Sequence, residues 1–83
     1  MTEPQQEVFG GVPAWLLVEY LASLGGSAVS DGQFEGEGWS ATVEPQPRPE
    51  GSHAIGRVTV TIEGTRSAEI MAELREKAQR GGG

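Results

Sequence analysis

Three carboxylates stand close together in one glycine-rich stretch of this 83-residue chain. Asp31, Glu35 and Glu37 fall within seven residues, and carboxylate oxygens are ligands that hard divalent cations prefer. Their spacing does not fit a calcium-binding loop, which supplies more oxygen ligands at alternate positions and closes with a glutamate. We therefore interpret the stretch as a solvated turn and keep a cation site as the alternative.

The single histidine offers a second kind of chemistry. His53 follows Glu50 by three residues, and a carboxylate beside an imidazole is the beginning of a general base. No activated nucleophile, second histidine or glycine-rich phosphate loop completes a catalytic constellation. The segment Gly36-Glu37-Gly38 lacks the remaining glycine of a dinucleotide fingerprint and its strand-to-helix setting. We expect a surface-loop histidine and a protein that is not an enzyme, with no catalytic residue, cofactor or metal.

The C-terminal run Gly81-Gly82-Gly83 suggests a carrier function. A flexible terminal diglycine is what ubiquitin-like sulfur carriers use for adenylation and thiocarboxylation. In those carriers the tail leaves a strand, whereas here it follows an amphipathic helical pattern. We therefore favour a helix stop with a frayed end over a carrier modified at Gly83.

The two tryptophans, Trp15 and Trp39, are large flat surfaces on which a ligand or a base could stack. Aromatic platforms bind single-stranded nucleic acid when a basic groove accompanies them. Residues 1–54 contain one arginine and eight acidic residues, so the sequence supplies no such groove. We expect both rings to be core or interface anchors.

Charge and composition exclude further classes of function. Twelve acidic residues against six basic ones give a net charge of −6, which repels phosphate backbones and anionic lipid, so we expect neither a nucleic-acid nor a membrane partner. The chain has no cysteine, which excludes disulfides, a thiol nucleophile and a Cys-based zinc site, and the leader Thr2–Glu7 is unlike a signal peptide. We expect a cytoplasmic protein. Its five arginines, five prolines and lack of asparagine are compatible with a thermophilic or GC-rich source.

Local sequence signals predict two helices. Pro13 suits a first helical turn and Gly25-Gly26 suits a left-handed stop, which predicts a helix over residues 13–24. After Gly64, with Thr65 or Ser67 as the cap, residues 66–80 form a second helix. Its narrow apolar stripe consists of Ile70, Met71, Leu74 and Ala78.

Residues of alternating polarity predict the strands. The alternation predicts strands over residues 39–44 and 55–63, in a sheet with one solvent-exposed face. Residues 7–12 are either a short strand or an extended lead-in to the helix. Between them, either Asp31-Gly32 or Gly36-Glu37-Gly38 makes a hairpin turn. Phe34 is an even-numbered and Trp39 an odd-numbered residue, so in one continuous strand their rings would point to opposite faces. We therefore favour a bulged or bent hairpin, which puts both rings on one face. The proline-rich residues 45–52 cannot enter a sheet interior.

These elements make one α+β domain over residues 1–83, with residues 1–6 and 81–83 frayed. It has two helices and a small antiparallel sheet of three to five strands, in the order (β)-α-β-β-β-α.

The first helix lacks a polar side. Leu17 and Leu21 lie on one face with other apolar residues, whereas Trp15, Leu16 and Tyr20 point elsewhere. A helix that is apolar all round is normally buried on more than one side. We infer that Trp15, Leu16 and Tyr20 form an interface with a second copy or with a protein partner. The alternative is that Trp15 or Tyr20 folds over the sheet edge.

Together, these elements resemble a known domain. The segments that carry the resemblance are Leu24-Gly25-Gly26, Glu35-Gly36-Glu37-Gly38-Trp39 and Gly56–Gly64, followed by the closing helix. They are similar to an uncharacterised bacterial domain, found alone or C-terminal to a MoaD-related module, that is, one like the small subunit of molybdopterin synthase. The resemblance covers residues 8–80 and implies a TATA-binding-protein-like α+β fold with no catalytic residues to carry over. That class has five strands, whereas at most three are convincing here.

The hypothesis we favour is a small acidic interaction module that oligomerises or docks through its first helix. The resemblance associates it with molybdopterin or sulfur-transfer metabolism. The alternatives are the carrier modified at Gly83 and a small-ligand sensor with a pocket between the first helix and the Trp39 strand.

Overall fold

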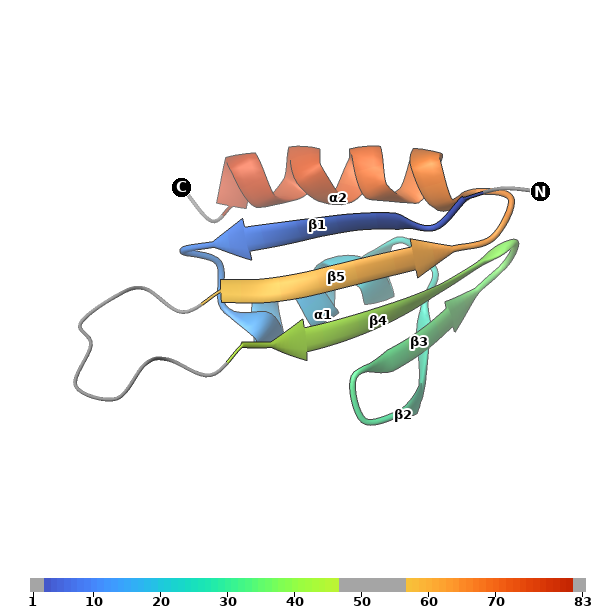
Figure 1. Cartoon of the computed structure of the whole chain (residues 1–83), viewed down its shortest axis with the longest axis horizontal. Coiled ribbons are helices and arrows are strands. Elements are labelled where there is room, and N and C mark those ends of the chain that lie inside the picture. The colour runs from blue at the N-terminus through green and yellow to red at the C-terminus, as the bar shows by residue number, and fades with distance from the viewer. Residues whose placement is uncertain (1–2, 47–56, 82–83) are drawn as a thin grey trace.

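The computed structural model describes residues 3–46 and 57–81, which form a five-stranded antiparallel sheet and two α-helices (Figure 1). The sheet order is β1-β5-β4-β3-β2. This arrangement confirms the predicted α+β class, with one strand more than the predicted order contained. The elements are β1 (Gln5–Gly10), α1 (Ala14–Ser23), β2 (Ser27–Ser30), β3 (Gln33–Gly36), β4 (Trp39–Pro45), β5 (Arg57–Glu63) and α2 (Ser67–Gly81).

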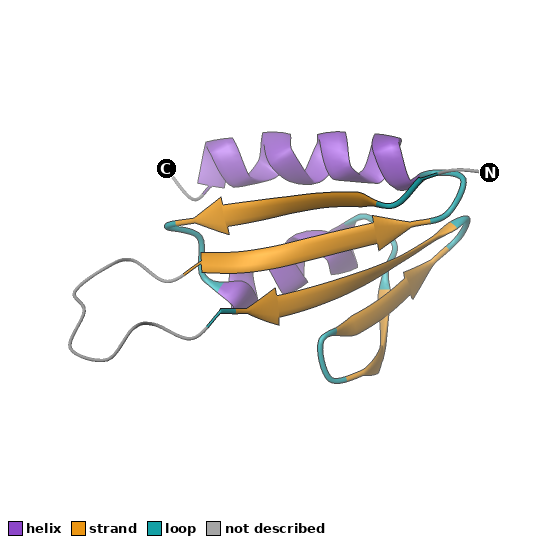
Figure 2. Ribbon diagram, in the orientation of Figure 1, coloured by secondary structure: helices purple, strands orange, loops and turns teal. Residues whose placement is uncertain are grey.

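Both helices pack on one face of the sheet and leave the other face open. In Figure 2, α1 lies behind the sheet and α2 runs alongside β1. On β5, Val58, Val60 and Ile62 are buried beneath the helices, whereas Thr59 and Thr61 face the open side. The same alternation on β4 buries Trp39, Ala41 and Val43. The predicted solvent-exposed face is therefore present, and the core lies between the sheet and the two helices.

The two alternative hairpin turns are both present. Asp31-Gly32 connects β2 to β3 and Glu37-Gly38 connects β3 to β4, with positive φ angles at both glycines. Phe34 pairs with Ala41, so reversal of the chain brings Phe34 to the face that buries Trp39. The favoured hairpin is confirmed, but the bulge lies in β2, between Ala28 and Ser30, because the reversal alone puts both rings on one face.

Of the two alternatives for residues 7–12, a short strand or an extended lead-in to the helix, the structure has a strand, β1, which ends at Gly10. Gln5 and Gln6 belong to β1, whose continuous register with β5 runs from Gln5–Ile62 to Gly10–Arg57. The Gln6 side-chain amide also donates to the Thr61 hydroxyl at 3.2 Å. The expectation that residues 1–6 are frayed is therefore wrong for residues 5 and 6, because pairing with β5 supplies hydrogen bonds that the local sequence does not reveal.

Helix α1 ends as the sequence predicts. Pro13 precedes it in an extended conformation. At its other end Gly25 has φ +100°, the Gly25 N–H donates to Ala22 and the Gly26 N–H donates to Leu21. These two bonds form a Schellman motif, which satisfies carbonyl groups that the helix leaves open.

One proline enters the sheet. Pro45 is the last residue of β4 and pairs with Val58, although we expected residues 45–52 to stay outside the sheet interior. The strand end tolerates it because the missing N–H would face the β3 side, as that of Val43 does, and β3 pairs with β4 only as far as Thr42. On the β5 side, the Gln46 N–H donates to the Arg57 carbonyl at 2.8 Å. The rest of this stretch, and residues 55 and 56 of the predicted last strand, lie outside the described residues.

The start of α2 is tied to the β3–β4 turn. The Arg66 N–H donates to the Gly38 carbonyl at 3.0 Å, and the Thr65 hydroxyl donates to the same oxygen at 3.4 Å instead of capping the helix. A hydrogen bond to Glu69 raises the pKa of Arg66. The predicted stripe is confirmed, since Ile70, Met71, Leu74 and Ala78 are all buried.

Candidate functional site

Most apolar residues of α1 are buried or partly buried against the core. Leu17 and Leu21 are fully buried, and Ala14, Val18 and Leu24 are partly buried against the same core. This is the inner face that the helical spacing predicts. Leu16 and Tyr20, which we expected to point elsewhere, are also partly buried and pack against the core.

Trp15 is the exception, because 63% of its surface is exposed. It shares the outward face of α1 with Glu19, one turn further along, and Ala22, both of which are exposed. Helix α2 lies against α1 and covers a side that the sheet cannot reach. The sequence predicts a large apolar surface on α1 that the domain cannot cover. Among the described residues, what remains exposed of it is the Trp15 indole and parts of the neighbouring side chains.

The other tryptophan belongs to the core. Trp39 is 4% exposed, and its indole lies so close to Gly26 and Gly36 that a Cβ atom at either would overlap the ring. At Gly26 that atom would lie 2.7 Å from the ring. The space between α1 and β4 is therefore filled by the Trp39 side chain itself. The ring takes up room that a ligand of the sensor hypothesis would need there.

The three carboxylates do not converge. Asp31 lies in the turn before β3 and Glu37 in the turn after it, while Glu35 faces the open side of the strand between them. Residues 3–46 and 57–81 contain no group of three or more His, Asp or Glu side chains that could hold a metal ion. The strand separates the two turns, so the solvated-turn interpretation is the one that the geometry supports.

Two other predicted features fall partly or wholly outside the described residues. His53 and Glu50 both lie in the undescribed segment 47–56. Of the terminal glycines, Gly81 is the last residue of α2, and the two that follow are not described.

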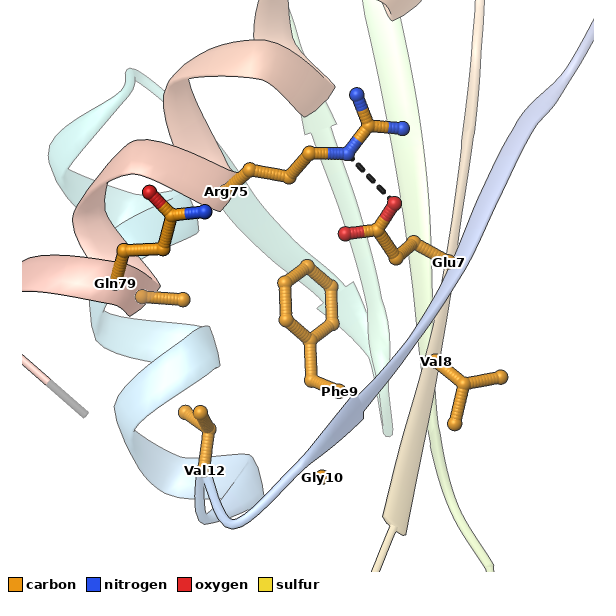
Figure 3. Close-up of a pocket in the computed structure, with 8 residues that line it drawn as sticks. Glu7, Val8, Phe9, Gly10, Val12, Arg75 and Gln79 are labelled. Carbon is orange, nitrogen blue, oxygen red and sulfur yellow. Dashed lines mark hydrogen bonds and ion pairs between the residues drawn. The ribbon is translucent and has the colours of Figure 1, made fainter. Parts of the chain in front are cut away.

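A groove of about 280 Å³ opens between β1 and α2, at the edge of the sheet (Figure 3). It is lined by Glu7, Phe9, Gly10, Val12, Arg75 and Gln79, among others. The Arg75 Nε donates to the Glu7 Oε1 at 2.6 Å across it. Sequence reasoning missed this groove; the only signal was the period of two in β1, which places Glu7 beside Phe9 on the helix side.

Exposed apolar side chains also mark both edges of the sheet. Val8 of β1 is 50% exposed and Val29 of β2 is 54% exposed. In Figure 3 the Val8 side chain points away from the groove, toward the open face. No helix of the described residues is long and apolar enough to cross a membrane.

Comparison with known protein families shows which family the chain belongs to. The family described as archaeal MoaD-like protein matches residues 5–83, which is nearly the whole chain. The chain belongs to this family. The match supports the MoaD-related part of the resemblance, and the family description names archaea where the resemblance was to a bacterial domain. The comparison with curated proteins gave no match.

Proposed function

We propose that this MoaD-like chain is a non-catalytic interaction module that docks on a protein partner through the outer face of α1, with Trp15 as its anchor. The observation that carries the proposal is the exposure of Trp15, 63%, on a regular helix. The other large rings at the sheet, those of Phe9, Phe34 and Trp39, are each at most 7% exposed. Tryptophan is among the residues that most often dominate the binding energy of an interface.

Charge indicates the chemistry of the partner. The chain carries −6, and Glu19 stands one turn from Trp15 on the same face of α1. A second copy would bring like charges together at this face, whereas a pocket with a basic rim would attract it. The partner is therefore a protein with an apolar, basic-rimmed pocket. Likeness to MoaD supports a partner from molybdopterin or sulfur-transfer metabolism, and the absence of cysteine supports a reducing, cytoplasmic setting.

Leu16 and Tyr20 have a mixed role in this proposal. Both pack against the core, so they hold α1 in place while their exposed margins border the docking face. A charged substitution at either position would disturb folding as well as binding. Trp15 is the position at which binding can be tested separately from stability.

Two steps test the proposal. A photo-crosslinking residue at position 15 identifies a candidate partner, which is then purified and titrated with wild-type protein and with Trp15→Ala. We expect Trp15→Ala to weaken binding about 30-fold, which corresponds to an anchor contribution of about 2 kcal/mol.

Val29→Ala is the matched control, because it also removes an exposed apolar side chain but on the far edge of the sheet. It should leave the dissociation constant unchanged. Equal affinities of wild type and Trp15→Ala for every crosslinked partner would refute docking through α1.

The carrier role at Gly83 is the alternative function, and the MoaD-like family match, which extends to Gly83, is compatible with it. Helix α2 runs through Gly81, so the first glycine of the run is helical rather than part of an extended tail. Incubation with cell extract and ATP, followed by intact mass measurement, separates the two functions. We expect an unmodified mass; an adenylate or thiocarboxylate would favour the carrier.

A further inference from the structure

The two edges of the sheet differ in how they are protected. β1 has six residues, a continuous register and no proline or lysine, whereas β2 has four residues and a register break between Ala28 and Ser30. Short strands, bulges, prolines, lysines, inward-pointing charges and covering helices are devices by which proteins block edge-to-edge pairing. The β2 strand is short and bulged, whereas β1 is neither; the one inward-pointing charge of β1, Glu7, is paired with Arg75 of the neighbouring helix α2.

The outer edge of β1 offers unused hydrogen-bonding groups. In an edge strand every second residue turns its N–H and C=O away from the neighbouring strand. Within residues 3–46 and 57–81, the backbone of Gln5–Gly10 bonds to β5 and to no other segment. Helix α2 packs on one face of the sheet, and the groove beside it opens at this edge (Figure 3).

Charge favours contact between copies at this edge. The only charged residue of β1 is Glu7, and Arg75 neutralises it in an ion pair. The opposite edge strand, β2, has no charged residue of its own, but the exposed acids Asp31, in the turn that follows it, and Glu35, on the neighbouring strand β3, lie beside it, and no described arginine or lysine pairs with them. In a chain of net charge −6, β1 is the edge at which two copies meet with least repulsion.

We propose that β1 pairs antiparallel with β1 of a second copy, which joins the two sheets into one of ten strands. The side chains of both copies must stay on their own face of the joined sheet. Only registers that place odd-numbered residues opposite odd-numbered ones, and even-numbered opposite even-numbered ones, are therefore allowed. The register with Val8 opposite Val8 of the second copy pairs five residues, Gln6–Gly10, and covers the exposed valine. Shifting it by one step in one direction places Glu7 opposite Glu7, which is unfavourable, and shifting it in the other shortens the ladder.

Sedimentation velocity over a concentration series tests the pairing. We expect the wild-type chain to reach twice its 8.8 kDa mass at high concentration. Val8→Lys should remain monomeric, because two ammonium groups would meet on the two-fold axis. Val29→Lys makes the same change at a similarly exposed position of the other edge and should still dimerise.

Cysteine crosslinking tests the register independently of that charge. The chain has no cysteine of its own, and opposed residues of an antiparallel pair have Cα atoms about 4.5–5.5 Å apart, within disulfide reach. Val8→Cys should form a disulfide-linked dimer under mild oxidation. Gln6→Cys should not, because in this register it lies about 13 Å along the strand from its mate.

A wild-type chain that stays monomeric at every concentration overturns the proposal, as does a dimer that Val8→Lys leaves intact. A dimer lost in Trp15→Ala but kept in Val8→Lys would place self-association on α1. The same experiment therefore separates this inference from the proposed docking function, since the two depend on different residues.

Discussion

Replacing Trp39 with alanine is expected to lower the free energy of unfolding by about 3–5 kcal/mol, the usual loss for a fully buried tryptophan. The indole is 4% exposed and packs closely against Gly26 and Gly36. Its removal leaves a cavity, because neither glycine has a side chain that could fill the space. A domain of this length has a total stability of roughly 4–12 kcal/mol, so the variant should lose a large fraction of it. Urea denaturation followed by far-ultraviolet circular dichroism measures the effect without relying on the tryptophan signal.

Trp15→Ala is the matched control for that experiment. It removes the same side chain from an exposed position, and we expect a change within about 0.5 kcal/mol. Trp39→Phe should fall between the two, because it keeps most of the ring and removes a buried Nε1–H that has no partner among the described residues. Equal destabilisation by Trp15→Ala and Trp39→Ala would show that the two rings are not distributed between surface and core as described.

Gly64→Ala is expected to have the second large effect on stability. Gly64 has φ +116°, a conformation that side chains rarely adopt, and a Cβ atom there would lie 2.5 Å from the Gly38 carbonyl oxygen and 2.8 Å from the Trp39 Cα. Both neighbours are backbone atoms of the β3–β4 turn and cannot rotate away. The loss should exceed the roughly 1–3 kcal/mol that a strained backbone conformation costs by itself.

Gly25→Ala isolates the steric part of that loss. Gly25 has φ +100° but nothing within 4 Å of its missing Cβ, so this variant incurs the conformational cost alone. Thermal melts of the two variants, compared at equal protein concentration, give the difference. Identical melting temperatures would mean that the approach of the β5–α2 connection to Gly38 is not rigid.

Local sequence patterns predict most of the secondary structure. The glycine pair after α1 and the apolar stripe of α2 predict both helices to within a residue at each end. The turn glycines predict both hairpins but not that they coexist, because each turn was a sufficient explanation of the polar stretch taken alone. Strand β1 stayed undecided for the same kind of reason: Gln5–Gly10 has few strand-forming residues, and its conformation comes from pairing with β5.

The candidate sites depended more on tertiary structure. The sequence identified Trp15, Leu16 and Tyr20 as one group, yet the fold packs the last two against the core and leaves Trp15 protruding. It contained no sign of the Glu7–Arg75 pair, whose partners are 68 residues apart. Hydrophobic period indicates the direction in which a side chain points but not which other element lies there to cover it.

By itself, then, the sequence determined the acidic charge, the α+β class, the helix ends and the inward and outward faces, since these follow from composition, capping and period within a few neighbouring residues. Only the tertiary structure decided that β1 is an edge strand, that the Trp39 ring packs against Gly26 and Gly36, and that a groove opens beside Arg75. Each of these depends on the spacing between segments that are distant in the chain, and that spacing is set by packing of the whole core.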